Sequence, residues 1–259
     1  MSQTIHHTAR PHGADAKQYG EAEARVDLAA CYRLMAHFGM SDLIYAHITC
    51  RVPGPGDYIL INPYGMLFEE ITASDLIKID LHGRIAQKSP WPVNAAGIVV
   101  HAALHASRPD VACIIHSHTV ASVAVSAQKS GLLPVSQFAM EFYNRIAYHE
   151  YEGLATDLDE SQRLVRDLGQ HTAMILRNHG LLTVGSSVAA AFERMYYLEL
   201  ACRTQVAAQQ SAAALHLPPT DVCEHAAAQY ATPGTMPKGE RVWQALLRML
   251  DRTDPSYRN

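Results

Sequence analysis

The spacing of apolar residues predicts a chain in which helices and strands alternate. Residues 21–38 are predicted to be a helix, because Val26, Ala30 and Leu34 recur at four-residue steps and Gly39 follows as a stop signal. Asn94 is suited to cap a second helix, which Pro109 would end. Helical segments are predicted over residues 94–107, 119–130, 138–147, 160–168 and 187–214, with an amphipathic stretch at 242–250.

Segments rich in β-branched and aromatic residues predict the strands. Residues 43–52 and 58–62 flank a Pro- and Gly-rich turn and are predicted to pair as a hairpin. Further strands are predicted over residues 76–81, 84–87, 110–118, 172–177 and 181–184. Strands alternate with helices and no internal repeat occurs, so we expect one α/β domain whose helices cover a mostly antiparallel or mixed sheet.

The two ends of the chain differ in composition from its centre. Residues 1–20 are polar and lack the apolar centre of a secretory signal, so we predict a disordered lead-in. The main domain is expected over residues 21–217. Residues 218–259 are rich in Pro and Ala and are predicted to form a C-terminal extension. This extension would either cover a neighbouring subunit's site, through Tyr230 or Tyr257, or form a mobile end.

The amino-acid composition and net charge argue against some classes of binding partner. Of the 259 residues 48% are hydrophobic and 18% charged, an ordinary globular balance. A formal net charge of -4 gives no electrostatic reason to bind nucleic acid or an anionic membrane. The apolar runs are too short to span a bilayer. The 5 cysteines are scattered without CxxC spacing, which predicts isolated buried thiols and a reducing cytoplasm. A small-molecule partner is expected.

The candidate chemistry rests on histidine, because the chain has 15 histidines and histidine is the commonest metal ligand. His116 and His118 end the predicted strand at 110–118. Residues two apart on a strand point to the same face, so both rings can bind one ion. Such a pair supplies half of a tetrahedral site, although two hydrogen-bonded strand histidines would give the same pattern.

His179 is the third candidate ligand. It follows the apolar strand at 172–177, and Gly180 beside it lets the backbone approach a cleft closely. Three neutral imidazoles with an open position make a catalytic site, in which the metal acts as a Lewis acid. Imidazole suits zinc and iron alike, so the pattern predicts a divalent metal, with Zn²⁺ first and Mn²⁺ or Fe²⁺ as alternatives.

In these ordered motifs the chain resembles the class II aldolase/adducin family, over about residues 21–209. The matching segments are Arg-Pro-Asp-Val at 108–111, His-Ser-His at 116–118, Arg-Asn-His-Gly-Leu-Leu-Thr-Val-Gly at 177–185 and Asn-Pro-Tyr-Gly at 62–65. The resemblance implies zinc on His116, His118 and His179. It also implies an α/β/α sandwich around a central, mainly antiparallel sheet, and a homotetramer with sites near subunit interfaces.

Departures from the sugar-phosphate aldolases of this family narrow the substrate. Those enzymes carry Ser-Ser-Glu ahead of a helical His, and alignment on His101 gives Ala95-Ala96-Gly97 here. Two alanines cannot donate side-chain hydrogen bonds to a phosphate. The phosphate-cradling Gly-Asn turn is also replaced, near Ala46-His47. We therefore expect a non-phosphorylated substrate. Gly97 also lacks the acid/base carboxylate, so a proton donor must come from elsewhere.

Several side chains are candidates for that donor. They are His101 and His105, which share a helix face, Glu141, Tyr143 and Tyr148. Each has an alternative reading as a packing residue. Arg145 could bind a substrate carboxylate in bidentate fashion or form a surface salt bridge.

Three hypotheses follow from the resemblance. The favoured one is a metal-dependent lyase, an aldolase or decarboxylase, that cleaves a C–C bond of a small carbonyl or carboxylate compound through a metal-stabilised enolate. The second is a non-haem Fe(II) oxygenase on the same histidines. The third is an adducin-like binding protein without catalysis, and the histidine trio counts against it because a scaffold has no need of three ligands.

Overall fold

The computed structural model describes residues 19–153, 158–211 and 213–259. The predicted disordered lead-in therefore lies outside the described residues, apart from Tyr19 and Gly20. Within the described chain, Gly20 begins the first helix, and its backbone N–H donates to the Glu23 carboxylate at 3.1 Å.

A seven-stranded sheet forms the centre of the described chain, in the order β3-β2-β1-β4-β7-β6-β5. Every neighbouring pair is antiparallel except β5 with β6, so the prediction of a mainly antiparallel sheet is confirmed. The strands are β1 (His47–Arg51), β2 (Tyr58–Ile61), β3 (Ile77–Asp80), β4 (Cys113–Ser117), β5 (Ala147–His149), β6 (Ala173–Leu176) and β7 (Gly180–Gly185).

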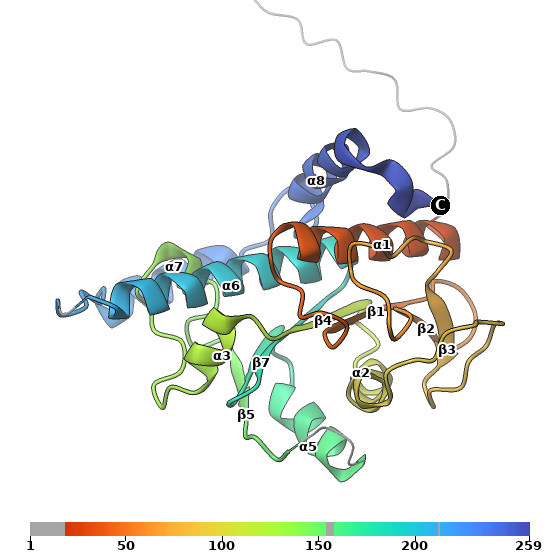
Figure 1. Ribbon diagram of the computed structural model, residues 1–259. Coiled ribbons are helices and arrows are strands. Elements are labelled where there is room, and N and C mark those ends of the chain that lie inside the picture. Colours follow the sequence, from red (N-terminus) through yellow and green to blue (C-terminus); the bar gives the residue numbers. More distant parts are fainter. Residues whose placement is uncertain (1–18, 154–157, 212) are drawn as a thin grey trace, which may run out of the picture.

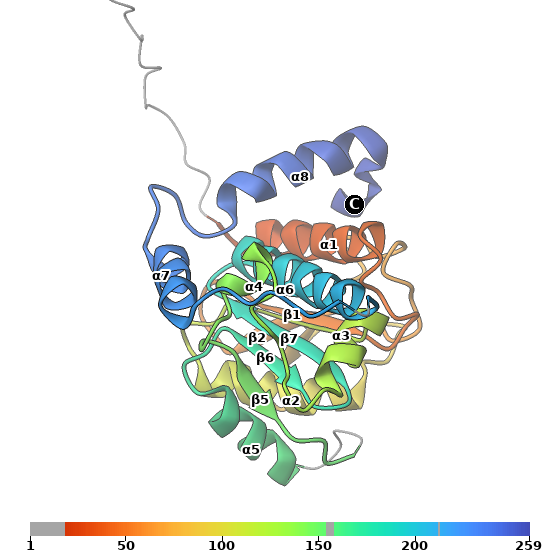
Figure 2. The same cartoon turned by 90° about the vertical axis from the view of Figure 1, so that its left-hand side faces the viewer.

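Helices cover both faces of the sheet, which confirms the three-layer α/β/α arrangement. Figures 1 and 2 show α1 and α6 on one face, α2 and α5 on the other, and α8 stacked outside α1. The helices are α1 (Glu21–His37), α2 (Ala95–Ser107), α3 (Val120–Ser126), α4 (Gln137–Met140), α5 (Leu158–Leu168), α6 (Val188–Gln209), α7 (Thr220–Ala231) and α8 (Glu240–Thr253), followed by the 3-10 turn η1 (Pro255–Arg258).

Side-chain alternation along β4 divides the core in two. Cys113 and Ile115 pack into the large cluster under α1 and α6, whereas Ile114 packs into the cluster under α2 and α5. Since side chains two apart share a face, His116 lies on the same face as Ile114. The candidate metal centre is therefore on the α2/α5 side of the sheet.

The prediction of a helix over residues 138–147 is wrong. Only α4, four residues long, is helical there, and strand β5 begins at Ala147. Asn144 has a left-handed backbone with φ of 52°, which a continuing helix cannot contain. Parallel pairing of Ala147 with Met174 then recruits the segment into the sheet, so tertiary pairing outweighs local helical propensity.

Smaller differences occur elsewhere. The predicted helix at 119–130 ends at Ser126, and the predicted strand at 84–87 makes a single bridge, from Ile85 to Ile79. Helix α7 was not predicted, because its sequence is mostly alanine and polar residues without an apolar stripe.

The C-terminal segment packs back onto the main domain. Helix α8 contacts α1 and α6, and the Tyr257 side chain is fully buried. The backbone N–H of Ala73 donates to the Tyr257 carbonyl at 2.9 Å, and Arg33 donates to the Asp254 carboxylate at 3.0 Å. These contacts tie the last residues of the chain to α1.

All 5 cysteines are free and buried, which confirms the prediction of isolated thiols. Among the described residues, no helix is both long and apolar enough to cross a membrane.

Candidate metal centre

Three histidines converge at one edge of the α2/α5 face. His116 lies near the end of β4, His118 just beyond it, and His179 in the turn between β6 and β7. The Nε2 atoms of His116 and His118 are 2.6 Å apart, and those of His118 and His179 are 3.0 Å apart. In the described part of the chain, this is the one group of three or more His, Cys, Asp or Glu side chains close enough to hold a metal ion.

Hydrogen bonds behind the rings fix their orientation. His116 Nδ1 lies 2.8 Å from the Leu181 carbonyl oxygen, which can only accept, so the ring proton is on Nδ1 and the Nε2 lone pair faces the cluster. His118 Nδ1 lies 3.0 Å from the Asp42 carboxylate in the same manner. Such partners behind ligating histidines set the tautomer and raise ligand basicity.

Burial keeps two of these rings neutral. It lowers the pKa of His116 well below the ordinary value, and nearby His118 and His179 add electrostatic repulsion. It also lowers the pKa of His179 to about 4, again with a contribution from His118. Because a metal binds the neutral imidazole, both rings are ready to act as ligands at neutral pH.

The backbone around His179 explains the Asn-His-Gly sequence. Asn178 adopts a left-handed conformation with φ of 56°, which asparagine tolerates better than most residues. At Gly180 any Cβ atom would lie 2.3 Å from the Ser117 carbonyl oxygen, so only glycine allows β7 to approach β4 this closely. The tight turn brings His179 beside His118.

His47 is a member of the site that sequence reasoning missed. Its position in β1 is directly opposite His116 in β4, and the two ring centroids are 5.2 Å apart. A Cβ atom at Gly97 would lie 2.4 to 2.9 Å from three atoms of the His47 ring. The imidazole thus occupies the volume that a side chain at position 97 would need. Burial lowers the pKa of His47 to about 4.

Two further buried histidines share one hydroxyl. Thr49 Oγ1 lies 2.8 Å from His101 Nδ1 and 2.9 Å from His105 Nε2. Burial lowers the pKa of His101 well below its ordinary range, and that of His105 to about 3. Both rings are therefore neutral, and the chain of contacts connects helix α2 to strand β1.

A cavity of about 440 Å³ opens onto the histidine cluster. Its wall includes His47, His101 and all three candidate ligands, so His101 lies in the cleft, one of the two places that the sequence left open. The remaining polar wall residues include Tyr45, Tyr64, His149, Glu150, Glu152, Glu160 and Arg177.

His149 is the second wall residue that sequence reasoning missed, because residues 148–159 had no predicted element and strand β5 was not expected. Its Nδ1 lies 2.7 Å from an Asp167 carboxylate oxygen of α5, and its Nε2 is 3.9 Å from the nearest Glu160 oxygen. The His149 side chain is 4% exposed. A carboxylate that orients an imidazole in this way prepares its other nitrogen for proton transfer.

The other sequence candidates do not line this cavity. The Tyr148 hydroxyl accepts a hydrogen bond from the Leu132 N–H, and the Arg177 guanidinium lies 4.3 Å from the centre of its ring. Tyr143 lines a separate hollow beside it. Arg145 pairs with Glu224 at 3.4 Å, and Glu141 pairs with Lys238 at 2.9 Å.

Comparison with known proteins gives the family. The sequence profile of the Class II Aldolase and Adducin N-terminal domain matches residues 26–206. The chain belongs to this family. A Pseudomonas aeruginosa relative named "Putative aldolase class 2 protein" is 47% identical over 244 residues, covering 92% of this chain and 93% of the relative.

Two other relatives carry different names, one an aldolase and one an adducin. The structure of L-fuculose 1-phosphate aldolase from Glaciozyma antarctica superposes with a TM-score of 0.80, at 26% identity, and covers 97% of both chains. Alpha-adducin of Rattus norvegicus is 42% identical over 266 residues, which cover 95% of this chain and 36% of the adducin. The relatives of this chain thus include a protein named as an aldolase and an adducin.

The contact between His47 and position 97 can be tested by Gly97→Ala. In an exposed helix this change stabilises by roughly 0.5–1 kcal/mol, but here we expect a loss of about 1–3 kcal/mol because the new methyl group meets a buried ring. Urea denaturation of Gly97→Ala, His47→Ala and the double variant measures the coupling. If the methyl group costs the same with and without the His47 ring, the ring does not occupy this volume.

The neutral buried histidines predict a pH dependence of stability. The unfolded chain binds protons on His47 and His105 below about pH 6.5, whereas the folded chain does so only near pH 4 and pH 3. Between these values the unfolded state binds more protons, so stability is constant above pH 6.5 and falls as the pH drops.

Each such histidine should lower the free energy of unfolding by about 2 kcal/mol as the pH falls from 6.5 to 5. In metal-free protein, His105→Gln should therefore lose about 2 kcal/mol less than the wild type over this range. Urea denaturation at pH 7, 6 and 5 is the measurement, with the surface variant His82→Gln as a matched control. Equal pH dependence in His105→Gln and the wild type would contradict the assignment.

Proposed function

We propose that the chain is a metal-dependent lyase that cleaves a C–C bond, by retro-aldol reaction or decarboxylation, in a small non-phosphorylated carbonyl or carboxylate compound. The observation that carries this proposal is the convergence of three Nε2 atoms. The Nε2 atom of His118 lies 2.6 Å from that of His116 and 3.0 Å from that of His179, and all three rings line one cavity.

The three rings fit a divalent cation. The Nδ1 atoms of His116 and His118 face hydrogen-bond acceptors, so their Nε2 lone pairs face each other, an arrangement that a cation would stabilise. Nitrogen ligands favour Zn²⁺, with Mn²⁺ or Fe²⁺ as alternatives. When bound, such an ion supplies Lewis-acid polarisation of a substrate oxygen.

The surrounding residues supply orientation and proton transfer. We assign proton transfer to His149, because its Nδ1–H donates to Asp167 and leaves Nε2 as the atom that can gain or release a proton. His101, whose ring lines the same wall, is the second candidate. His47 is neutral and fills the space beside Gly97, so it excludes water there. Tyr143 and Tyr148 are left out because they do not line this chain's cavity.

The walls support a non-phosphorylated substrate. A phosphate dianion would meet Arg177 together with Glu150, Glu152 and Glu160. Arg163 pairs with Glu152 from outside the wall, and a smaller excess of negative charge remains on these side chains. The Arg177 guanidinium is already engaged, since it donates to the Gln128 carbonyl at 2.7 Å. A carbonyl oxygen or a single carboxylate places less charge against these side chains.

Assembly and location are part of the same proposal. Two large apolar side chains next to the histidine cluster are exposed, Leu43 at 68% and Val120 at 88%. They offer a surface for a neighbouring subunit near the site, as a homotetramer of the family type requires. Free buried cysteines fit a cytoplasmic location.

A second candidate is a binding protein without catalysis. The 42% identity to alpha-adducin over 95% of this chain favours it. In that case the histidines would be structural, and metal would be dispensable. Metal analysis therefore discriminates between the two candidates.

Elemental analysis of untagged protein should give about one divalent metal per chain. The His116→Ala/His118→Ala variant should lose it, and the matched surface variant His82→Ala/His225→Ala should keep it. Asp42→Asn should weaken metal affinity by about 10- to 100-fold, because the carboxylate orients His118. Iron as the resident metal would favour an oxygenase. No metal in any preparation, even after reloading, would leave the adducin-like role.

Activity should appear when metal-loaded protein is screened against a panel of hydroxy- and keto-acids. His149→Gln should lower kcat by about 10²- to 10⁴-fold, the usual contribution of a general acid or base, with metal content unchanged. His105→Gln, a buried histidine outside the cavity wall, is the control. Full activity in His149→Gln would remove this residue from the mechanism without affecting the metal assignment.

A further inference from the structure

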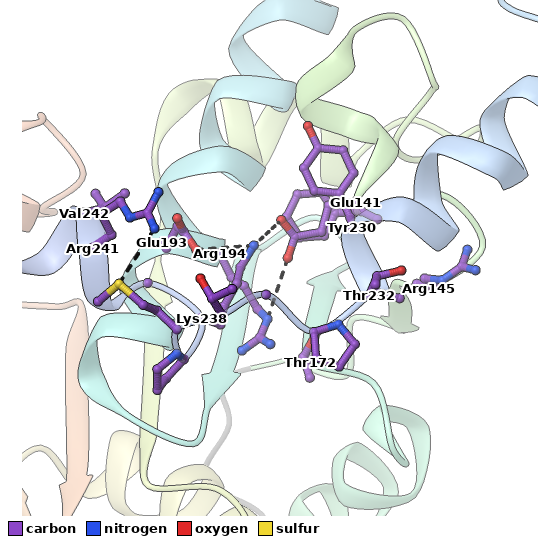
Figure 3. A pocket seen from close by; sticks show the side chains of 18 residues that line it. Glu141, Arg145, Thr172, Glu193, Arg194, Tyr230, Thr232, Lys238, Arg241 and Val242 are labelled. Carbon is purple, nitrogen blue, oxygen red and sulfur yellow. Dashed lines mark hydrogen bonds and ion pairs between the residues drawn. The ribbon is translucent and has the colours of Figure 1, made fainter. Parts of the chain in front are cut away.

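A second and larger cavity, of about 990 Å³, lies apart from the histidine centre. It is formed by the end of α4, the first half of α6, the start of β6 and the segment from Tyr230 to Val242 that joins α7 to α8 (Figure 3). The two cavities share no lining residue. The second cavity therefore needs an explanation of its own.

Its lining carries an excess of positive charge. The lining holds four cations, Arg145, Arg194, Lys238 and Arg241, and two carboxylates, Glu141 and Glu193. Arg145 also pairs with Glu224, which lies outside the lining. The two carboxylates are also more buried than Lys238 and Arg145. Each carboxylate side chain is 14% exposed, against 30% for Lys238 and 37% for Arg145. A ligand entering from solvent therefore meets Lys238 and Arg145 first, whereas Arg194, at 17%, lies almost as deep as the carboxylates.

Lys238 neutralises both carboxylates at once. Its Nζ lies 2.9 Å from Glu141 Oε2 and 3.3 Å from Glu193 Oε2, and Figure 3 shows it between them. An ammonium group has three N–H donors, so one remains for a further acceptor. The ion pairs also hold the α7–α8 segment against α6 and α4.

Arg194 is the most buried of the four cations, with a side chain that is 17% exposed. One guanidinium nitrogen donates to the Val184 carbonyl at 3.0 Å. Its Nε is buried without a hydrogen-bond partner among the described residues, and lies 3.8 Å from Glu141 Oε1, beyond hydrogen-bonding distance. Burial lowers the pKa of Arg194 despite the nearby Glu141 and Glu193. A buried cation with unused donors gains stability from an added anion.

We propose that this cavity binds a small oxyanion, a carboxylate or a phosphate, through Arg194 and Lys238. The planar guanidinium fork suits two oxygens of one group, and the ammonium adds a point charge. Thr172, also in the lining, can donate its hydroxyl hydrogen to a remaining oxygen, whereas the Thr232 hydroxyl already donates to the Ala228 carbonyl at 3.0 Å. This site does not depend on the proposed lyase function, since it shares no residue with the histidine centre.

Isothermal titration calorimetry of the full-length, metal-free protein at low ionic strength tests the proposal. Malonate and inorganic phosphate are titrated separately, so the tighter of the two identifies the preferred chemistry. We expect saturable binding of one anion per chain. Arg194→Gln and Lys238→Gln should each weaken binding at least tenfold, whereas Arg166→Gln, an arginine that is 72% exposed on α5, should leave it within twofold.

Two further variants keep the test decisive. Arg145→Gln changes a half-exposed residue, so it should fold normally and weaken binding severalfold. His116→Ala/His118→Ala should bind the anion as the wild type does. Loss of binding in that double variant would locate the anion at the histidines and overturn the proposal. Absence of saturable binding by either anion, or wild-type affinity in folded Arg194→Gln and Lys238→Gln, would overturn it as well.

Discussion

The antiparallel pairing of β4 with β1 and β7 is the constraint on which the candidate site depends. Register alone sets His47 opposite His116, and it sets His116 next to Leu181, whose carbonyl fixes the ring's tautomer. A slip of one residue in β4 would turn His116 toward α1 and α6. The apolar residues Ile114 and Ile115, locked into opposite cores, prevent that slip. The hydrophobic core thus holds the polar site in place.

The sequence predicted most of this arrangement, and its failures have physical causes. Period-two spacing placed His116 and His118 on one face, which is a local property. His179 was grouped with them only through the family resemblance, because its place beside His118 depends on the pairing of β7 with β4. His47 could have been found only from the register of β1 against β4, which is a long-range property. His149 was missed because β5 is only three residues long and forms by pairing with β6, a contact that the local sequence does not reveal.

Desolvation links the fold to the chemistry. The same burial that stabilises the α2/α5 layer removes water from His47, His101, His105 and His116, and each of their pKa values falls. Neutral imidazoles are tolerated in a core and are also the form that binds metal. Thr49 reduces the cost further, since its single hydroxyl serves two rings. Stability and ligand readiness therefore share one origin.

The exchange of a carboxylate for an imidazole alters the charge of the site. In the sugar-phosphate aldolases that the chain resembles, a glutamate stands where this chain has Gly97, and here the neutral His47 ring fills that space. The three candidate ligands and His47 are all neutral, so none of them would offset the charge of a bound dication. The Asp42 carboxylate behind His118 is the nearby negative charge that would do so in part. A less compensated dication attracts anionic oxygens more strongly and polarises a carbonyl more effectively. The loss of the carboxylate is therefore compatible with catalysis, and it favours a substrate with a single carboxylate, whose charge the acidic wall opposes less than that of a phosphate dianion.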